Sequence, residues 1–161
     1  MTTADLVRLN QRIARSALGN ELNEAQETYL GFLSVCLGRF ALSATDLNRM
    51  LVWSKPSHEN ELAVMHLNRD YLNYARLASM DARSGRFDRL VELGLTIELA
   101  EILLALTNEQ ITRIALYWPG LVVKIDTRVF ECGNSLHTLA GRYHATAFLS
   151  ATNSQKIQQT I

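Results

Sequence analysis

The segment at residues 93–111, LGLTIELAEILLALTNEQI, constrains the fold more than any other part of the chain. Its apolar residues repeat at helical spacing over residues 97–106, which predicts a short helix. Thr107 follows at once and has Gln110 three residues later, the spacing of a capping box that begins a new helix. The two helices must therefore meet at an abrupt corner with almost no loop between them.

A third helix is predicted immediately before this corner. Gly94 stands where a left-handed helix end is expected, and Thr96 stands where an N-cap is expected. Three short helices in this order predict a trihelical, helix-turn-helix-like unit. Such units often read DNA, although tight helical corners also occur as plain core packing in all-α domains.

Helical periodicity accounts for most of the remaining chain, whose 48% hydrophobic residues and two prolines are typical of a globular helical protein. The pattern over residues 59–93 predicts either one bent helix or two helices separated near Ser84 and Gly85, and we favour two. The other predicted helices cover residues 3–18, 23–40, 46–52, 107–118 and 135–148.

The hydrophobic period changes after Pro119 and Gly120. Apolar or β-branched residues alternate with polar ones over residues 121–130, which predicts a half-buried strand. A lone strand carries unpaired backbone groups, so we expect it to pair with a hairpin partner or with a second chain. The predicted fold class is mainly α, a helical bundle with one short β segment.

The Pro-containing stretch at residues 54–57 is the best candidate for a domain boundary. We therefore expect an N-terminal helical subdomain at residues 1–55 and a second helical domain at residues 59–149. Residues 150–161 are rich in Ser, Thr, Asn and Gln, and we expect them to form a flexible tail.

The chain has 16 basic and 16 acidic residues, so its formal net charge is zero. This balance argues against a protein that holds nucleic acid by charge alone.

Neither a secretory signal nor an apolar run of about 18 residues is recognisable, so we expect a cytoplasmic protein without membrane contact. Cys36 and Cys132 each stand in apolar surroundings; we expect buried free thiols, with an intermolecular disulfide as the alternative.

The residue patterns of known catalytic and metal sites are missing. The four histidines, at positions 58, 66, 137 and 144, lack the i, i+4 spacing of a helical metal pair. Cys132 and His137 lie close in sequence, but a zinc site would need two further ligands. Phosphate-binding loops, hydrolase elbows and kinase signatures are also missing from the sequence. We therefore expect no enzyme, no metal site and no cofactor.

Three stretches follow one another almost without gaps: LNRDYLNYARL at residues 67–77, RLVELGLT at 89–96 and LLALT at 103–107. The pattern continues through the helix that Thr107 begins and into the predicted strand at residues 121–130. From about residue 66 to 130 the chain resembles the FlhD family, a subunit of the flagellar master transcription activator and of related activators of conjugative elements.

This resemblance implies a homodimer or higher oligomer that joins an FlhC-like partner, which supplies a zinc site and much of the DNA contact. The expected function is that of a subunit of a bacterial transcriptional activator complex that binds promoter DNA together with this partner. The alternative is a helical protein–protein adaptor without direct DNA binding. Exposed apolar residues on the helix predicted at residues 23–40 would favour the adaptor, and a basic face around Arg86, Arg89 and Arg113 would favour the activator.

Seven residues are candidates for DNA contact within such a complex. Asn108 and Thr112 project from the helix that follows Thr107 and could reach base edges. Glu98, Glu101 and Glu109 lie nearby in sequence and would repel phosphate. The basic candidates, which would contact phosphates or a groove, are Arg86, Arg89, Arg113, Lys124 and Arg128.

Overall fold

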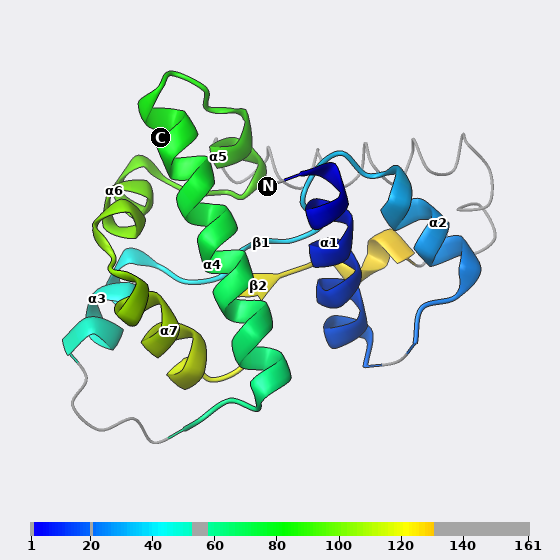
Figure 1. Cartoon of the computed structure of the whole chain (residues 1–161), viewed down its shortest axis with the longest axis horizontal. Coiled ribbons are helices and arrows are strands. Elements are labelled where there is room, and N and C mark those ends of the chain that lie inside the picture. The colour runs from blue at the N-terminus through cyan, green and yellow to red at the C-terminus, as the bar shows by residue number, and fades with distance from the viewer. Residues whose placement is uncertain (1, 20, 53–57, 131–161) are drawn as a thin grey trace. The chain divides into compact units, whose positions relative to one another are not determined.

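The computed structural model describes residues 2–19, 21–52 and 58–130 (Figure 1). Within these ranges the fold is mainly helical with one short, two-stranded antiparallel sheet, which confirms the predicted fold class. The helices are α1 (Thr3–Leu18), α2 (Glu24–Phe32), α3 (Ala44–Val52), α4 (Leu62–Arg83), α5 (Asp88–Glu92), α6 (Ile97–Ala105) and α7 (Asn108–Tyr117). The strands are β1 (Arg39–Phe40) and β2 (Val123–Lys124), and a 3-10 turn, η1, covers Thr127–Phe130.

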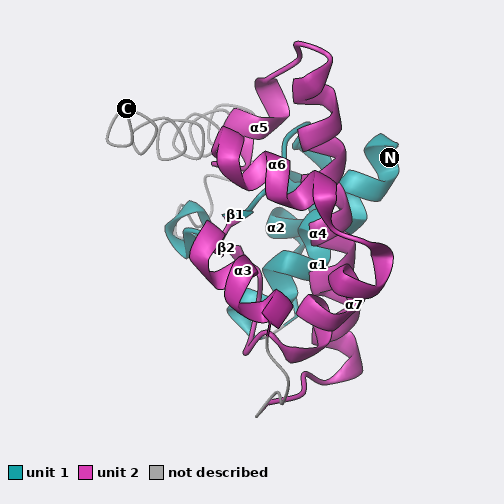
Figure 2. Cartoon of the chain, turned by 90° about the vertical axis from the view of Figure 1, so that its left-hand side faces the viewer, with its two compact units in different colours: residues 1–39, 125–161 teal, residues 40–124 magenta. Residues whose placement is uncertain are grey.

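The chain divides into two compact units, one of residues 1–39 and 125–161 and the other of residues 40–124 (Figure 2). This division differs from the predicted boundary at residues 54–57. The physical reason is that α3 packs against α6 and α7, so residues 44–52 belong with the second unit. The helix predicted at residues 135–148 and the tail predicted at 150–161 lie outside the described residues.

In the first unit, both ends of α1 and the start of α2 lie close to the predicted positions. Thr2 and Asp5 form a capping box at the start of α1, and Asn23 and Gln26 form the predicted one at the start of α2. The two helices pack against each other through apolar faces. The buried apolar residues on these faces are Leu6, Leu9, Ile13, Ala14, Ala25, Tyr29 and Leu30.

The prediction that the second helix continues to Phe40 was wrong, because α2 ends at Phe32. The following segment bonds instead to Asn10, which is fully buried on α1. The Asn10 amide donates to the Val35 carbonyl over 2.8 Å and accepts the Leu37 N–H over 2.7 Å. Leu33 and Leu37 are buried in this non-helical segment. Their spacing, which matches that of a helix, arises because both side chains are buried and not because the segment is helical.

In the second unit, α4 contacts each of α5, α6 and α7. Tyr71 and Leu72 on α4 are fully buried, as are Leu103 on α6 and Ile114 on α7. The pattern over residues 59–93 forms two helices, as predicted. Gly85, at φ 82°, separates them in the left-handed conformation that glycine adopts without strain.

Two buried asparagines hold the carboxyl end of α7. The Asn60 side chain donates to the carbonyls of Ala115 and Trp118, over 3.0 and 2.5 Å, and its backbone N–H donates to the Leu116 carbonyl over 2.7 Å. On α4, Asn68 donates to the Gly120 carbonyl over 2.8 Å and accepts the Val122 N–H over 2.9 Å. These bonds fix the turn between α7 and β2.

The strand predicted over residues 121–130 is correct only at its centre. β2 covers Val123–Lys124 and pairs with β1, a distant strand of the same chain, so it uses neither of the two expected partners. Residues 127–130 form η1, in which Val129 and Phe130 are buried. Within the first unit Phe130 packs edge-on against Tyr29, with ring centroids 6.3 Å apart, and this burial favours the turn over a longer strand.

We predict that Asn68→Ala lowers the free energy of unfolding by about 1–3 kcal/mol, because the buried groups that Asn68 satisfies lose their partner. Urea unfolding monitored by circular dichroism measures this change. Asn73→Ala on the exposed face of α4 is the matched control and should shift stability by less than about 0.5 kcal/mol. Equal effects of the two substitutions would contradict the role given to Asn68.

The start of α3 predicts a pH-dependent contribution to stability. The Ser43 hydroxyl and backbone N–H both donate to the Asp46 carboxylate, and these bonds lower the pKa of Asp46. A lowered folded pKa means that the contribution is present above the unfolded pKa of about 3.9 and is lost as the pH falls through the folded value.

Asp46→Ala should therefore cost about 0.5 kcal/mol at neutral pH, and the cost should disappear in acid. The measurement is the difference in unfolding free energy between variant and parent, followed from neutral pH down to about pH 2. Asn48→Ala, an exposed neutral position on α3, should show a difference that does not change with pH. A pH-independent cost of Asp46→Ala would refute this explanation.

Candidate nucleic-acid interface

The corner between α6 and α7 has the predicted geometry. The Thr107 side chain accepts the Gln110 N–H over 3.2 Å, and the Gln110 side chain accepts the Thr107 N–H over 2.8 Å. Only Leu106 and Thr107 separate the two helices. Gly94, at φ 65°, ends the preceding turn, and the Thr96 hydroxyl accepts the Leu99 N–H at the start of α6. Helices α5, α6 and α7 therefore follow one another in the predicted order, and their main packing partner is α4.

The outer surface of α6 and α7 carries acidic side chains. Glu98 and Glu101 on α6 and Glu109 on α7 are all exposed. Three carboxylates on neighbouring helices make an unfavourable surface for phosphate. The α6–α7 corner thus lacks the positive surface charge that DNA attracts.

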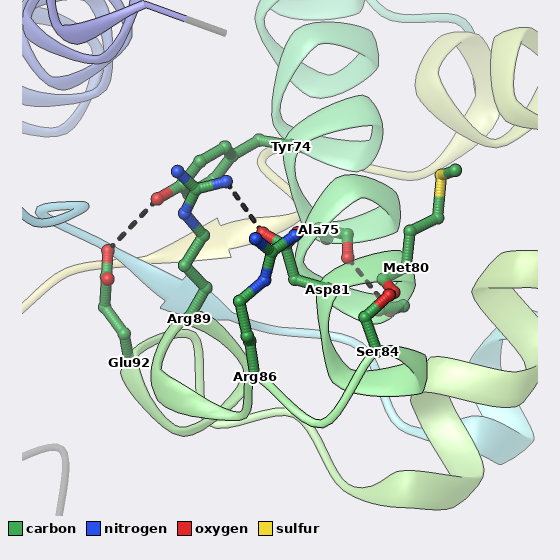
Figure 3. Close-up of polar contacts among 9 residues, drawn as sticks. Tyr74, Ala75, Met80, Asp81, Ser84, Arg86, Arg89 and Glu92 are labelled. Atoms are coloured by element: carbon green, nitrogen blue, oxygen red, sulfur yellow. Dashed lines mark hydrogen bonds and ion pairs between the residues drawn. The ribbon is translucent and has the colours of Figure 1, made fainter.

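Arg86 and Arg89 both point toward one carboxylate, that of Asp81 at the end of α4 (Figure 3). The Asp81 oxygens accept from Arg86 Nη2 over 2.5 Å and from Arg89 Nη1 over 2.9 Å. Asp81 is only 22% exposed, whereas the Arg86 side chain is 71% exposed. Beside them the Tyr74 hydroxyl donates to Glu92 over 3.3 Å. These two predicted DNA contacts are therefore tied to the corner between α4 and α5.

Asn108 and Thr112 lie together at the start of α7, next to a residue that the sequence reasoning missed. Arg76 on α4 donates to the Asn108 side-chain carbonyl over 3.1 Å. The Thr112 hydroxyl donates to the Asn108 backbone carbonyl over 3.0 Å. Both candidates are exposed, and Arg76 is half-buried beside them. Its spacing of seven residues from both Arg69 and Arg83 was the signal that could have identified it.

The remaining three candidates lie in separate places. Arg113 is half-buried on α7, and Lys124 is exposed on β2. Arg128 belongs to the other unit, where it forms an ion pair with Asp126. The hydrogen bond from the Arg128 side chain lowers the pKa of Asp126. The structure thus brings together Arg86 with Arg89 and Asn108 with Thr112, but it does not gather all seven residues at one site.

The other sequence predictions on chemistry concern metal and cysteine. Among the residues that the structure describes, no three His, Cys, Asp or Glu side chains lie close enough to hold a metal ion. Cys36 is fully buried, as predicted. Cys132 and His137, the pair considered for zinc, lie outside the described ranges, as does His144. In the part of the chain that the structure describes, no helix has the length and apolar character needed to cross a membrane.

We predict that Asp81→Asn lowers the free energy of unfolding by about 1 kcal/mol or less, because two charged hydrogen bonds at a partly exposed site are weakened. Added salt should shrink the difference, since screening weakens the ion pairs in the parent protein. Thermal unfolding at low and high ionic strength measures both effects. Glu101→Gln, an exposed position in the interior of α6, is the control and should show neither.

No family model, curated protein or solved structure matches the chain.

Proposed function

We propose that the chain is a subunit of a bacterial transcriptional activator complex in the cytoplasm, similar in role to FlhD, and that it binds promoter DNA together with an FlhC-like partner. The observation that carries the proposal is the order of elements over residues 62–124. A long helix is followed by a Leu-Gly turn, two capped helices that meet at Thr107, and a strand. The stretches that resemble the FlhD family fall on these elements in the same order.

The charge distribution supports a subunit that works in an assembly. The outer residues of α6 and α7 are acidic, and Arg86 and Arg89 are paired with Asp81. A chain of zero net charge with such a surface attracts DNA only weakly by itself. Sharing the DNA contact with a second protein removes this difficulty, so the proposal includes a partner and a homodimer or higher oligomer.

Exposed apolar side chains also favour contact with protein. Leu77 and Met80 on α4 are 38% and 54% exposed, and Phe87 and Val91 on α5 are 50% and 41% exposed. Met80 points away from the Asp81 ion pairs (Figure 3). Leu62 on α4 is 70% exposed as well, and exposed apolar side chains along these two helices favour contact with another chain in the proposed assembly.

The adaptor without DNA binding is the second candidate, and the same apolar residues favour it. We expected exposed apolar residues on the helix predicted at residues 23–40 to favour the adaptor over the activator, but this surface does not favour it. Of the apolar residues on the helix predicted at 23–40, only Phe32 is among the large exposed ones, at 38%, while Tyr29, Leu30, Leu33 and Leu37 are buried. We therefore keep the activator subunit as the main proposal.

Chromatin immunoprecipitation of the tagged chain in the bacterium that produces it tests the proposal. We expect enrichment at a small set of promoters and lower transcription from them when the gene is deleted. Met80→Asp combined with Val91→Asp should abolish enrichment by blocking assembly, while Glu98→Gln should not.

Copurification of a protein partner without promoter enrichment would favour the adaptor and overturn the activator. Size measurement at micromolar concentration provides an independent test of assembly. A clean monomer would contradict the homodimer that the proposal includes.

A further inference from the structure

Helix α4 carries three arginines at regular spacing: Arg69 and Arg76, which are half-buried, and Arg83, which is exposed. Seven residues are nearly two helical turns, and a straight helix drifts by only about 20° over each such step. The three side chains therefore leave α4 within about 40° of one another. At a rise of 1.5 Å per residue, successive members are about 10 Å apart along the helix axis and the row spans about 21 Å. We call Arg69, Arg76 and Arg83 the α4 arginine row.

The charge of this row is not neutralised within the described residues. Arg69 and Arg83 make no ion pair there, and Arg76 donates to Asn108, whose amide is neutral. The acidic residues of α4 are Asp70 and Asp81. At about 100° per residue, each lies about 100° or more around the helix from all three arginines. Asp81 is in addition engaged by Arg86 and Arg89.

The helix beside the row adds hydrogen-bonding groups. α7 packs against α4, as Figure 1 shows, and the bond from Arg76 joins the row to Asn108. Asn108 and Thr112 are exposed at this position, and the exposed carboxylate of Glu109 leaves α7 about 100° around the helix from Asn108. A row of uncompensated guanidinium groups flanked by an amide and a hydroxyl matches the groups that proteins use to bind nucleic-acid phosphates.

We propose that the α4 arginine row binds the phosphate backbone of duplex DNA, with Asn108 and Thr112 contacting the same strand at its edge. This inference rests on the proposed function and names the surface through which this chain would take part in it. The row is assigned to phosphates because most protein–DNA hydrogen bonds, those from arginine included, go to phosphate and sugar oxygens. Guanidinium groups bind phosphate oxygens in a bidentate manner, which suits a row with few members.

The test compares the full-length chain with two triple variants in a titration of a fluorescent duplex of about 30 base pairs and random sequence. The first variant is Arg69→Gln, Arg76→Gln and Arg83→Gln. The second is Arg8→Gln, Arg15→Gln and Arg49→Gln, three exposed arginines on α1 and α3. Both lose three positive charges at different positions; of the arginines replaced in the control variant, Arg15 and Arg49 are paired with Glu27 and Asp46 in the parent. Glutamine keeps helix propensity close to that of arginine, and circular dichroism checks the folding of each variant.

We expect the row variant to bind the duplex at least about tenfold more weakly at low salt and the control variant to stay within about twofold of the parent. Each lost phosphate contact removes about 0.9 from the slope of log affinity against log salt, so the row variant should lose between about 2 and 3. Equal weakening of duplex binding by the two variants would refute the proposed role of the α4 arginine row. Unchanged binding by the row variant, or no detectable binding by the parent protein, would also refute it. Binding of the parent to labelled polyglutamate but not to duplex would mean an acidic protein partner, which also overturns the proposal.

Promoter enrichment of the row variant in cells separates this inference from the function on which it rests. If the parent and the row variant occupy promoters equally, the activator subunit stands and the row is wrong. If the parent occupies none, the activator subunit fails whatever the titration gives. If the parent occupies promoters and the row variant does not, the result supports both the activator subunit and the DNA-binding role of the row.

Discussion

Two buried asparagines, Asn60 and Asn68, determine how the central helices of the 40–124 unit align. The last carbonyl groups of a helix lack partners within it, and the two amides satisfy those of α7 from inside the protein. Because Asn68 lies on α4, the same bonds set α4 and α7 side by side in opposite directions. That alignment brings Arg76 to Asn108, eight residues further along α4 and seven residues back along α7. The geometry of the candidate interface thus follows from bonds formed at its far end.

The elements that were predictable from sequence are those whose ends are decided locally. Thr107, Asn23 and Ser43 begin helices through bonds to a residue three positions later, and these bonds are readable from spacing alone. The end of α2 and the length of β2 depend on Asn10 and on the burial of Phe130. Both involve partners more than twenty residues away, which local spacing does not reveal.

In the candidate site, the pairing of charged side chains likewise could not be predicted from the sequence. Sequence position identifies Arg86 and Arg89 as basic, but only the folded chain shows that both pair with the carboxylate of Asp81. Arg69 and Arg83 stand outside the helical corner from which the DNA contacts were predicted. Their spacing of seven residues from Arg76 was visible in the sequence, whereas their lack of carboxylate partners in the described part of the chain was not.

The arrangement of side chains around α4 gives a physical reason why partner binding and DNA binding would be coupled in the proposed complex. At about 100° per residue, Met80 leaves the helix about 40° from Arg76, and Leu77 leaves it about 40° from Asp81. The two exposed apolar residues therefore lie between the arginine row and the acidic flank. A protein that covers Leu77 and Met80 would border the row and exclude water along one side of it. Exclusion of water strengthens the attraction between guanidinium and phosphate, so assembly would raise the affinity of a row that is weak in the isolated chain.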